Sequence, residues 1–198
     1  MRETRHPLQG WRIVGLSVLA IGAMVGVIWL VHGIDEQGMR MAIRATARTS
    51  CVLFLCAFVA STLHRIWSTP LTAWLLKNRR YLGLSFAVSH TYHAIAILGL
   101  WFVTSGSALK FDPLGTLGYI FLIAMTVTSF KRPAAWIGQP AWKILHSTGM
   151  HYFWLGFTLE FSLRISQSMF IYLPLSILLV VAMMLRLVAP RMQRKLAS

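Results

Sequence analysis

The chain has 198 residues, of which 57% are hydrophobic and 12% charged, and its formal net charge is +14. Soluble domains carry about 25% charged residues, so this composition excludes an ordinary soluble domain. The basic residues flank apolar segments and form no separate basic surface, which also excludes a nucleic-acid-binding protein.

Six apolar segments follow one another along the chain, and about 20 apolar residues cross a bilayer. They cover residues 13–31, 49–64, 81–103, 113–130, 142 to about 161, and 165–185. No small-residue cleavage site follows the first segment, so it is predicted to be an uncleaved span. We therefore predict an all-α integral membrane bundle of six transmembrane helices, forming a single transmembrane domain over residues 1–198. Six spans leave no room for a fused flavin or nucleotide domain.

Lysine and arginine are distributed unevenly between the two ends of these segments. If both termini lie inside, fourteen of these residues fall on the inner side and five on the outer side. Because cytoplasmic loops collect lysine and arginine, both termini are predicted to be cytoplasmic. The expected location is the inner membrane of a bacterial-type cell, in a multi-pass arrangement within the lipid bilayer.

Three arginines repeat every four residues before the second segment: Arg40, Arg44 and Arg48. This spacing places them on one face of a helix. One interpretation is an extended second helix whose arginines reach the outer interface and pair with Asp35 or Glu36. The other is a stripe that binds carboxylates, such as cofactor propionates, through bidentate guanidinium contacts.

Histidine is the main candidate functional residue. His6 lies in a terminal tail and His32 at the outer end of the first segment, where solvent or the interface explains them. The other five lie within or at the ends of apolar segments: His64, His90, His93, His146 and His151. Ionisable side chains inside a span are costly and mark functional sites by default.

The depths of these histidines form two layers. With a rise of about 1.5 Å per residue, His90 and His93 lie about 14 and 18 Å above the start of the third segment. On the same scale His146 and His151 lie about 6 and 14 Å above the start of the fifth. We therefore expect His90 or His93 to face His151 near the middle of the membrane, and His64 to meet His146 nearer the cytoplasm.

Imidazoles on facing helices are a recurrent way to hold heme in a helical core. Heme iron with two protein ligands favours electron transfer over oxygen activation. Carboxylates are scarce in the segments, so a hard-cation site or an acidic proton relay lacks ligands. We expect heme, with His93 ranked above His90 and with His146 and His151 ranked equally as ligands of the iron.

Two sequence motifs resemble those of a known family. Residues 79–84 (RRYLGL) with 89–93 (SHTYH) resemble the third-helix signature of ferric reductase-like transmembrane domains. Thr128-Ser129, followed by Trp142 and Leu145-His146, resembles that family's pattern before and within the fifth helix. The similarity covers residues 53 to about 161.

This family includes the heme-binding membrane subunit of the periplasmic methionine sulfoxide reductase system, NADPH oxidases and metalloreductases. The resemblance implies a six-helix bundle with b-type heme between the third and fifth helices, and it implies His93 and His146 as ligands. The chain departs from the family at two points. Where the family has a further histidine in the fifth helix, this chain has Leu159-Glu160. Where the oxidases have an early histidine in the third helix, this chain has Arg79 or a residue near it.

Two further features have alternative interpretations. Glu160 and Arg164 are four residues apart, which predicts a salt bridge at the rim; a proton or cation site is the alternative. The basic segment 131–143 is expected to anchor to anionic lipid or to dock a soluble flavoprotein.

The predicted function is electron transfer across or within the membrane, so the chain is an oxidoreductase or an electron-transfer subunit. The electrons are expected from a quinol or a separate reductase, with quinone or a partner's flavin as the associated cofactor. The acceptor is ferric iron, a periplasmic partner or oxygen. The alternatives are a histidine-based metal or proton transporter without heme, and a cofactor-free anchoring subunit.

Overall fold

The computed structural model describes residues 8–108 and 112–196, with the backbone alone described for residues 190–196. Within these ranges all regular structure is helical. The six helices are α1 (Trp11–His32), α2 (Glu36–Ile66), α3 (Pro70–Val103), α4 (Pro113–Val127), α5 (Lys131–Leu163) and α6 (Met169–Leu196). The all-α fold class and the six helices are confirmed.

The number of candidate spans is smaller than the number of helices. By length and composition α1, α2, α3 and α6 could each cross a membrane, whereas α4 and α5 pass the test only together, as a pair bent by 112°. There are thus four candidate spans, or five if the bent pair is one span, against the six expected. The reason is that α4 has only 15 residues and α5 begins with the basic residues Lys131 and Arg132. About 20 apolar residues are needed for a full crossing.

The α2 and α3 helices begin well before the apolar segments from which they were predicted. The side chain of Asp35 caps α2, because its Oδ1 accepts a hydrogen bond from the Gly38 N–H at 2.9 Å. Pro70 occupies the first position of α3, where its missing N–H costs nothing. The expected extension of the second helix through the three arginines is therefore confirmed.

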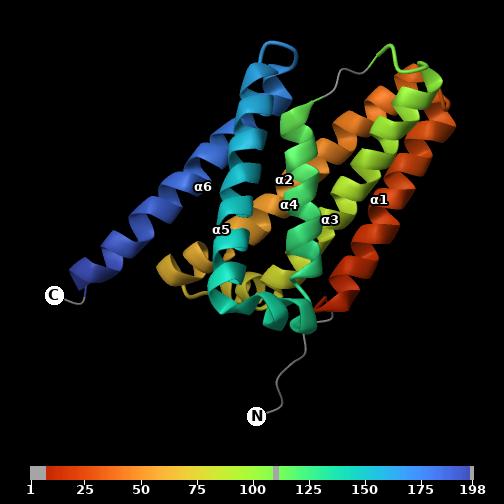
Figure 1. Ribbon diagram of the computed structural model, residues 1–198. Coiled ribbons are helices and arrows are strands. Elements are labelled where there is room, and N and C mark those ends of the chain that lie inside the picture. The colour runs from red at the N-terminus through yellow and green to blue at the C-terminus, as the bar shows by residue number, and fades with distance from the viewer. Residues whose placement is uncertain (1–7, 109–111, 197–198) are drawn as a thin grey trace. The chain divides into compact units, whose positions relative to one another are not determined.

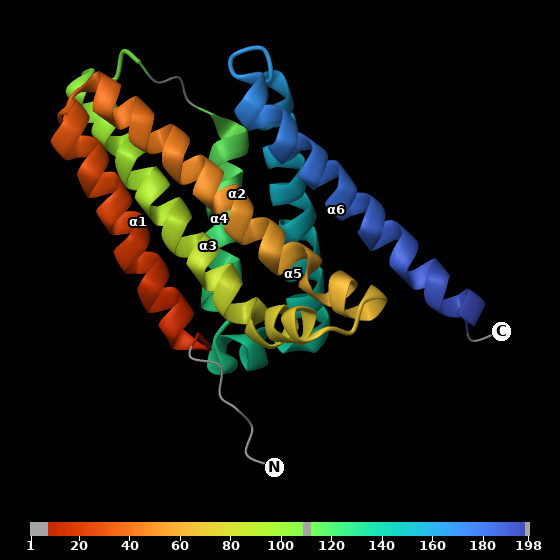
Figure 2. The same ribbon diagram turned by 180° about the vertical axis from the view of Figure 1, so that it is seen from behind.

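The chain forms two compact units (Figures 1 and 2). Unit 1 comprises Met1–Phe54 and Arg80–Leu114. It therefore contains α1, the part of α2 up to Phe54, and the part of α3 from Arg80 onward. Unit 2 comprises Leu55–Arg79 and Gly115–Ser198, and so contains the end of α2, the start of α3, all of α4 after its first two residues, and α5 and α6.

Unit 1 is held together by close packing of α1, α2 and α3. Val25, Ala42 and Ala96, one from each helix, form a buried core. Gly22 allows Tyr92 to approach α1, since a Cβ there would lie 2.8 Å from the phenolic oxygen. Small residues at helix contacts are typical of membrane bundles, where van der Waals packing drives association.

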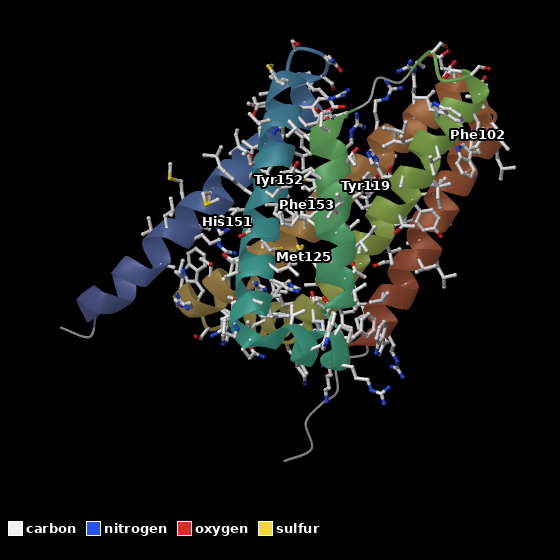
Figure 3. All side chains as sticks on the ribbon, in the orientation of Figure 1. Phe102, Tyr119, Met125, His151, Tyr152 and Phe153 are labelled. Atoms are coloured by element: carbon white, nitrogen blue, oxygen red, sulfur yellow. The ribbon has the colours of Figure 1, made fainter. Side chains whose placement is uncertain are left out.

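Unit 2 has a close contact between α4 and α5. Gly149 faces Met125, and the Tyr152 and Phe153 rings lie over Gly118. Figure 3 shows Tyr152 and Phe153 on the side of α5 that faces Met125 and α4. This contact fixes which face of α5 is turned toward α4.

A second contact in unit 2 joins α5 to α6. Trp154 Nε1 donates a hydrogen bond to the Leu179 carbonyl at 2.9 Å, and the Phe161 and Tyr172 rings lie 5.6 Å apart. Figures 1 and 2 show α6 diverging from α5 as it leaves the turn between them.

The first part of α5 differs from the rest of the helix. Gly138 has φ 76° and ψ 159°, which breaks the helical path, and Pro140 follows it. Trp136, in the segment before the break, is 89% exposed. The basic start of α5 is therefore a separate helical segment with its own exposed surface.

Candidate functional site

The candidate histidines belong to both units. His90 and His93 lie on α3 in unit 1. His64, near the end of α2, and His146 and His151, on α5, lie in unit 2.

The His90 and His93 side chains lie together in unit 1, as their spacing predicts. Their ring centroids are 5.3 Å apart. His90 also lies against Phe86, with 5.0 Å between the ring centroids, and Phe86 in turn contacts Phe54 of α2. The pair therefore faces α2 within unit 1.

The hydrogen bonds of His93 define its tautomer. Its Nδ1 lies 3.1 Å from the Ile43 carbonyl oxygen and 3.0 Å from Thr46 Oγ1. A carbonyl only accepts hydrogen bonds, so Nδ1 carries the proton and donates it. The Thr46 hydroxyl donates to the Ala42 carbonyl at 2.7 Å, which leaves its oxygen as an acceptor for Nδ1. The lone pair of His93 is consequently on Nε2.

A line of small polar side chains runs beside His93 between α2 and α3. Ser50 donates to Ser89 at 2.9 Å, and Ser89 donates to the Thr46 carbonyl at 3.2 Å. Four of these residues are fully buried: Thr46, Ser50, Ser85 and Ser89. Sequence reasoning missed this seam, although the spacing of four residues within each pair, 46/50 and 85/89, was visible. Only the packing of α2 against α3 determines that these faces of the two helices meet.

His146 is fixed by the end of α4. Its Nε2 lies 3.0 Å from Thr128 Oγ1, and the same hydroxyl donates to the Ala124 carbonyl at 2.7 Å. The Thr128 oxygen therefore accepts from the imidazole, so the Nε2 of His146 is protonated and its lone pair is on Nδ1. Trp142 stacks on His146 at 4.3 Å and donates its indole N–H to the Thr128 carbonyl. Three residues of the family-like motif thus contact one another.

His151 lies on the opposite side of α5 from the α4 contact. It is two residues from both Gly149 and Phe153, which face α4, and each residue turns the helix by about 100°. Figure 3 shows its side chain on the side of α5 away from α4. Its Nδ1 donates to the Ser147 carbonyl at 2.7 Å, so its lone pair is on Nε2. The ring is exposed and meets Phe58 edge-on, with 6.0 Å between centroids.

His64 does not meet His146 in unit 2. Its Nδ1 lies 3.2 Å from Thr72 Oγ1, in the turn between α2 and α3. No hydrogen bond or ring contact joins His64 to His146 in the part of the chain that the structure describes. The reason is that His146 is held against α4 by Thr128 and Trp142, whereas His64 is held by the turn.

The arginine stripe and the rim pair lie on the helices expected for them. Arg40 forms a salt bridge to Glu36, with both side chains about half exposed. Such exposed pairs contribute about 0–1 kcal/mol. Arg44 is exposed and Arg48 is partly buried. Glu160 and Arg164 form the expected salt bridge.

The described residues contain no group of three or more His, Cys, Asp or Glu side chains that could hold a metal ion. A structural or catalytic zinc ion takes three or four such ligands from the protein. Heme iron needs only one or two axial ligands, because the macrocycle supplies the others.

Comparison with known proteins found no match to a protein-family model, to a curated protein or to a solved structure.

Proposed function

We propose that this chain is a b-type heme protein that carries electrons in a membrane. One observation carries the proposal: each unit has a histidine on an apolar helix whose Nδ1–H is donated to a backbone carbonyl. The bond from His93 goes to Ile43 and the bond from His151 goes to Ser147. Histidines that bind metals commonly use this arrangement, because the bond fixes the tautomer and raises the basicity of the other nitrogen.

His93 in unit 1 and His151 in unit 2 are accordingly the proposed ligands of heme iron, each argued from the hydrogen bonds of its own unit. His146 is the ligand that the resemblance to ferric reductase-like domains implies, but its Nε2 proton is donated to Thr128. Its other nitrogen, Nδ1, is the one nearer the helix backbone, where a macrocycle has less room. We therefore rank His146 below His151, with Thr128 and Trp142 as its supports. One heme is expected and two are allowed.

Heme would supply a one-electron carrier inside the apolar layer, and the chain's own residues would bind and orient it. The described residues form helices only, so they contain no sheet-based flavin or nucleotide domain. A quinol or a separate reductase is therefore the proposed donor, and ferric iron or a periplasmic partner the proposed acceptor. The proposed location is the inner membrane, with both termini cytoplasmic, as the bias in lysine and arginine favours.

The test is a reduced-minus-oxidised spectrum of the purified protein, with heme quantified per chain. We expect low-spin b-type bands that are lost or shifted to high spin in His93→Ala and in His151→Ala. His32→Ala, at the end of α1, is the matched control and should keep the wild-type spectrum.

The same variants assign the ligands. Loss of the bands in His146→Ala but not in His151→Ala would restore the ligand set that the family resemblance implies. A colourless protein from heme-replete cells would reject the heme proposal. In that case the transporter or anchoring roles would have to be considered.

A further inference from the structure

Two arginines far apart in the sequence are anchored on the same stretch of α2 within unit 2. Arg79 of α3 donates from Nη1 to Ser61 Oγ at 3.0 Å. Arg186 of α6 donates from Nη1 to the Phe58 carbonyl at 3.1 Å, and its guanidinium lies 4.4 Å from the centre of the Phe58 ring. Phe58 and Ser61 are three residues apart, which is about 4.5 Å along the helix axis and about 60° around it. The two guanidinium groups are thus held close enough for their charges to interact.

No carboxylate in the described part of the chain pairs with either of these positive charges. Neither arginine forms a salt bridge within the described residues, where the two ion pairs are Arg40–Glu36 and Arg164–Glu160. Glu160 is the sole acid in the sequence of unit 2, and it is bound to Arg164. His146 is another ionisable neighbour of Arg79, and it brings no negative charge.

Both arginines are partly buried among apolar helices. Like charges held together in such surroundings repel one another, and taking them out of water is costly unless they are paired. Each guanidinium uses only one of its several N–H donors in the bonds described, so each retains donors for an anion.

We propose that Arg79 and Arg186 bind a phosphate group. Arg79 lies two residues before the apolar segment 81–103 and Arg186 directly follows the segment 165–185, so both lie where apolar helix gives way to the interface. A phosphate group has several oxygens that can accept paired hydrogen bonds from guanidinium groups. It therefore suits two arginines better than an anion with a single acceptor atom does. Its source is an anionic lipid headgroup or a soluble phosphate compound. The site does not depend on heme.

The test measures the thermal unfolding of delipidated protein in dodecyl maltoside. One arm adds phosphatidylglycerol and the other adds inorganic phosphate, each against sodium chloride at equal ionic strength. If phosphatidylglycerol raises the unfolding midpoint of the wild type and inorganic phosphate does not, the site binds a lipid headgroup. A rise with inorganic phosphate in the absence of lipid identifies a site for soluble phosphate.

Arg79→Gln and Arg186→Gln should each weaken the apparent affinity by about tenfold or more, because each removes a charge-assisted contact. Arg164→Gln is the control and should keep the wild-type affinity. Arg79→Lys and Arg186→Lys retain the charge but lose the paired N–H donors of the guanidinium group. They replace the glutamine variants if those do not fold, and they should bind phosphate more weakly than the wild type.

The proposal is overturned if neither phosphate source raises the wild-type midpoint, or if Arg164→Gln loses as much affinity as the other variants. Repeating the assay with His93→Ala protein from which heme has been extracted separates this site from the proposed heme function. Phosphate-dependent stability should persist in that variant.

Discussion

Thr46 and His93 form a hydrogen-bonded pair in which the hydroxyl oxygen lies 3.0 Å from Nδ1, while the same hydroxyl donates to the Ala42 carbonyl. The threonine thereby acts as an acceptor for the imidazole and fixes the orientation of the ring. Removing such a support around a metal-binding histidine commonly costs about 10–100-fold in affinity.

Thr46→Val should accordingly lower heme affinity about tenfold or more, measured as faster transfer of heme from the purified protein to apomyoglobin. Thr46→Ser should keep the wild-type rate, since it retains the hydroxyl. Thr49→Val is the control: the Thr49 hydroxyl bonds to the Ala45 carbonyl and the Met24 thioether. Equal rates in Thr46→Val and Thr49→Val would contradict a supporting role for Thr46.

Gly149 and Met125 should be energetically coupled across the contact between α4 and α5. A Cβ at position 149 would clash with Met125 Sδ and lie 3.4 Å from the Phe121 ring, so Gly149→Ala must displace the thioether. Overpacking of this kind costs about 1–3 kcal/mol. The double variant Gly149→Ala/Met125→Ala should be more stable than the sum of the single effects predicts, by about 0.5 kcal/mol or more in chemical unfolding.

Gly156→Ala is the matched control, because nothing lies within 4 Å of a Cβ at that position of α5. It should be neutral or stabilising, as alanine is the better helix former. Strictly additive effects of Gly149→Ala and Met125→Ala would show that the two positions do not touch.

Gly138 should tolerate no other residue without loss of stability. Its φ of 76° with ψ of 159° lies in a region that is essentially restricted to glycine, and forcing a side chain there costs about 1–3 kcal/mol. Gly138→Ala should lower the thermal midpoint, whereas Gly83→Ala, with open space around its Cβ, should not. An unchanged midpoint in Gly138→Ala would mean that the break in α5 does not require this backbone conformation.

Trp154 should stabilise the pairing of α5 with α6. Trp154→Phe removes the donor to the Leu179 carbonyl, and a hydrogen bond of this kind contributes about 0.5–1.5 kcal/mol. We expect a loss of that size in the free energy of unfolding. Trp67→Phe, at an exposed position, is the control and should unfold like the wild type. Equal stability of the two variants would exclude a contribution from the indole N–H.

The topology of α4 and α5 should be resolved by labelling single cysteines in a cysteine-free background. If α4 and α5 cross separately, Gln139→Cys should react from the cytoplasmic side, and Ser107→Cys and Gln167→Cys from the other side. This is the outcome that the basic residues of the segment 131–143 favour. If the bent pair is one span, Gln167→Cys reacts from the cytoplasmic side instead.

The first helix shows how far hydropathy alone can go. The apolar run 13–31 predicted a span, and α1 is Trp11–His32. The second helix shows the limit, because its apolar run began at residue 49 whereas α2 begins at Glu36. Charged residues end an apolar run without ending a helix, since arginine and glutamate are good helix formers. Capping by Asp35, and not the change in hydropathy, sets the start.

The candidate site was predictable in its residue types and not in its connections. The five histidines stand out in the sequence because ionisable groups in apolar segments are rare. The pairing of Thr46 with His93 joins residues 47 positions apart, and the anchoring of Arg186 on Phe58 joins residues 128 positions apart. The periodicity of residues within one helix does not predict such contacts between helices.

Membrane residence, the all-α class and the number of helices were determined by the sequence itself, because each depends on the length and composition of a continuous segment. The tertiary structure decided which ring nitrogen of His93, His146 and His151 holds a proton, and it brought Arg79 and Arg186 to the same stretch of α2. These properties depend on acceptors and charges that other helices bring to the side chain, and only packing determines which helices are neighbours.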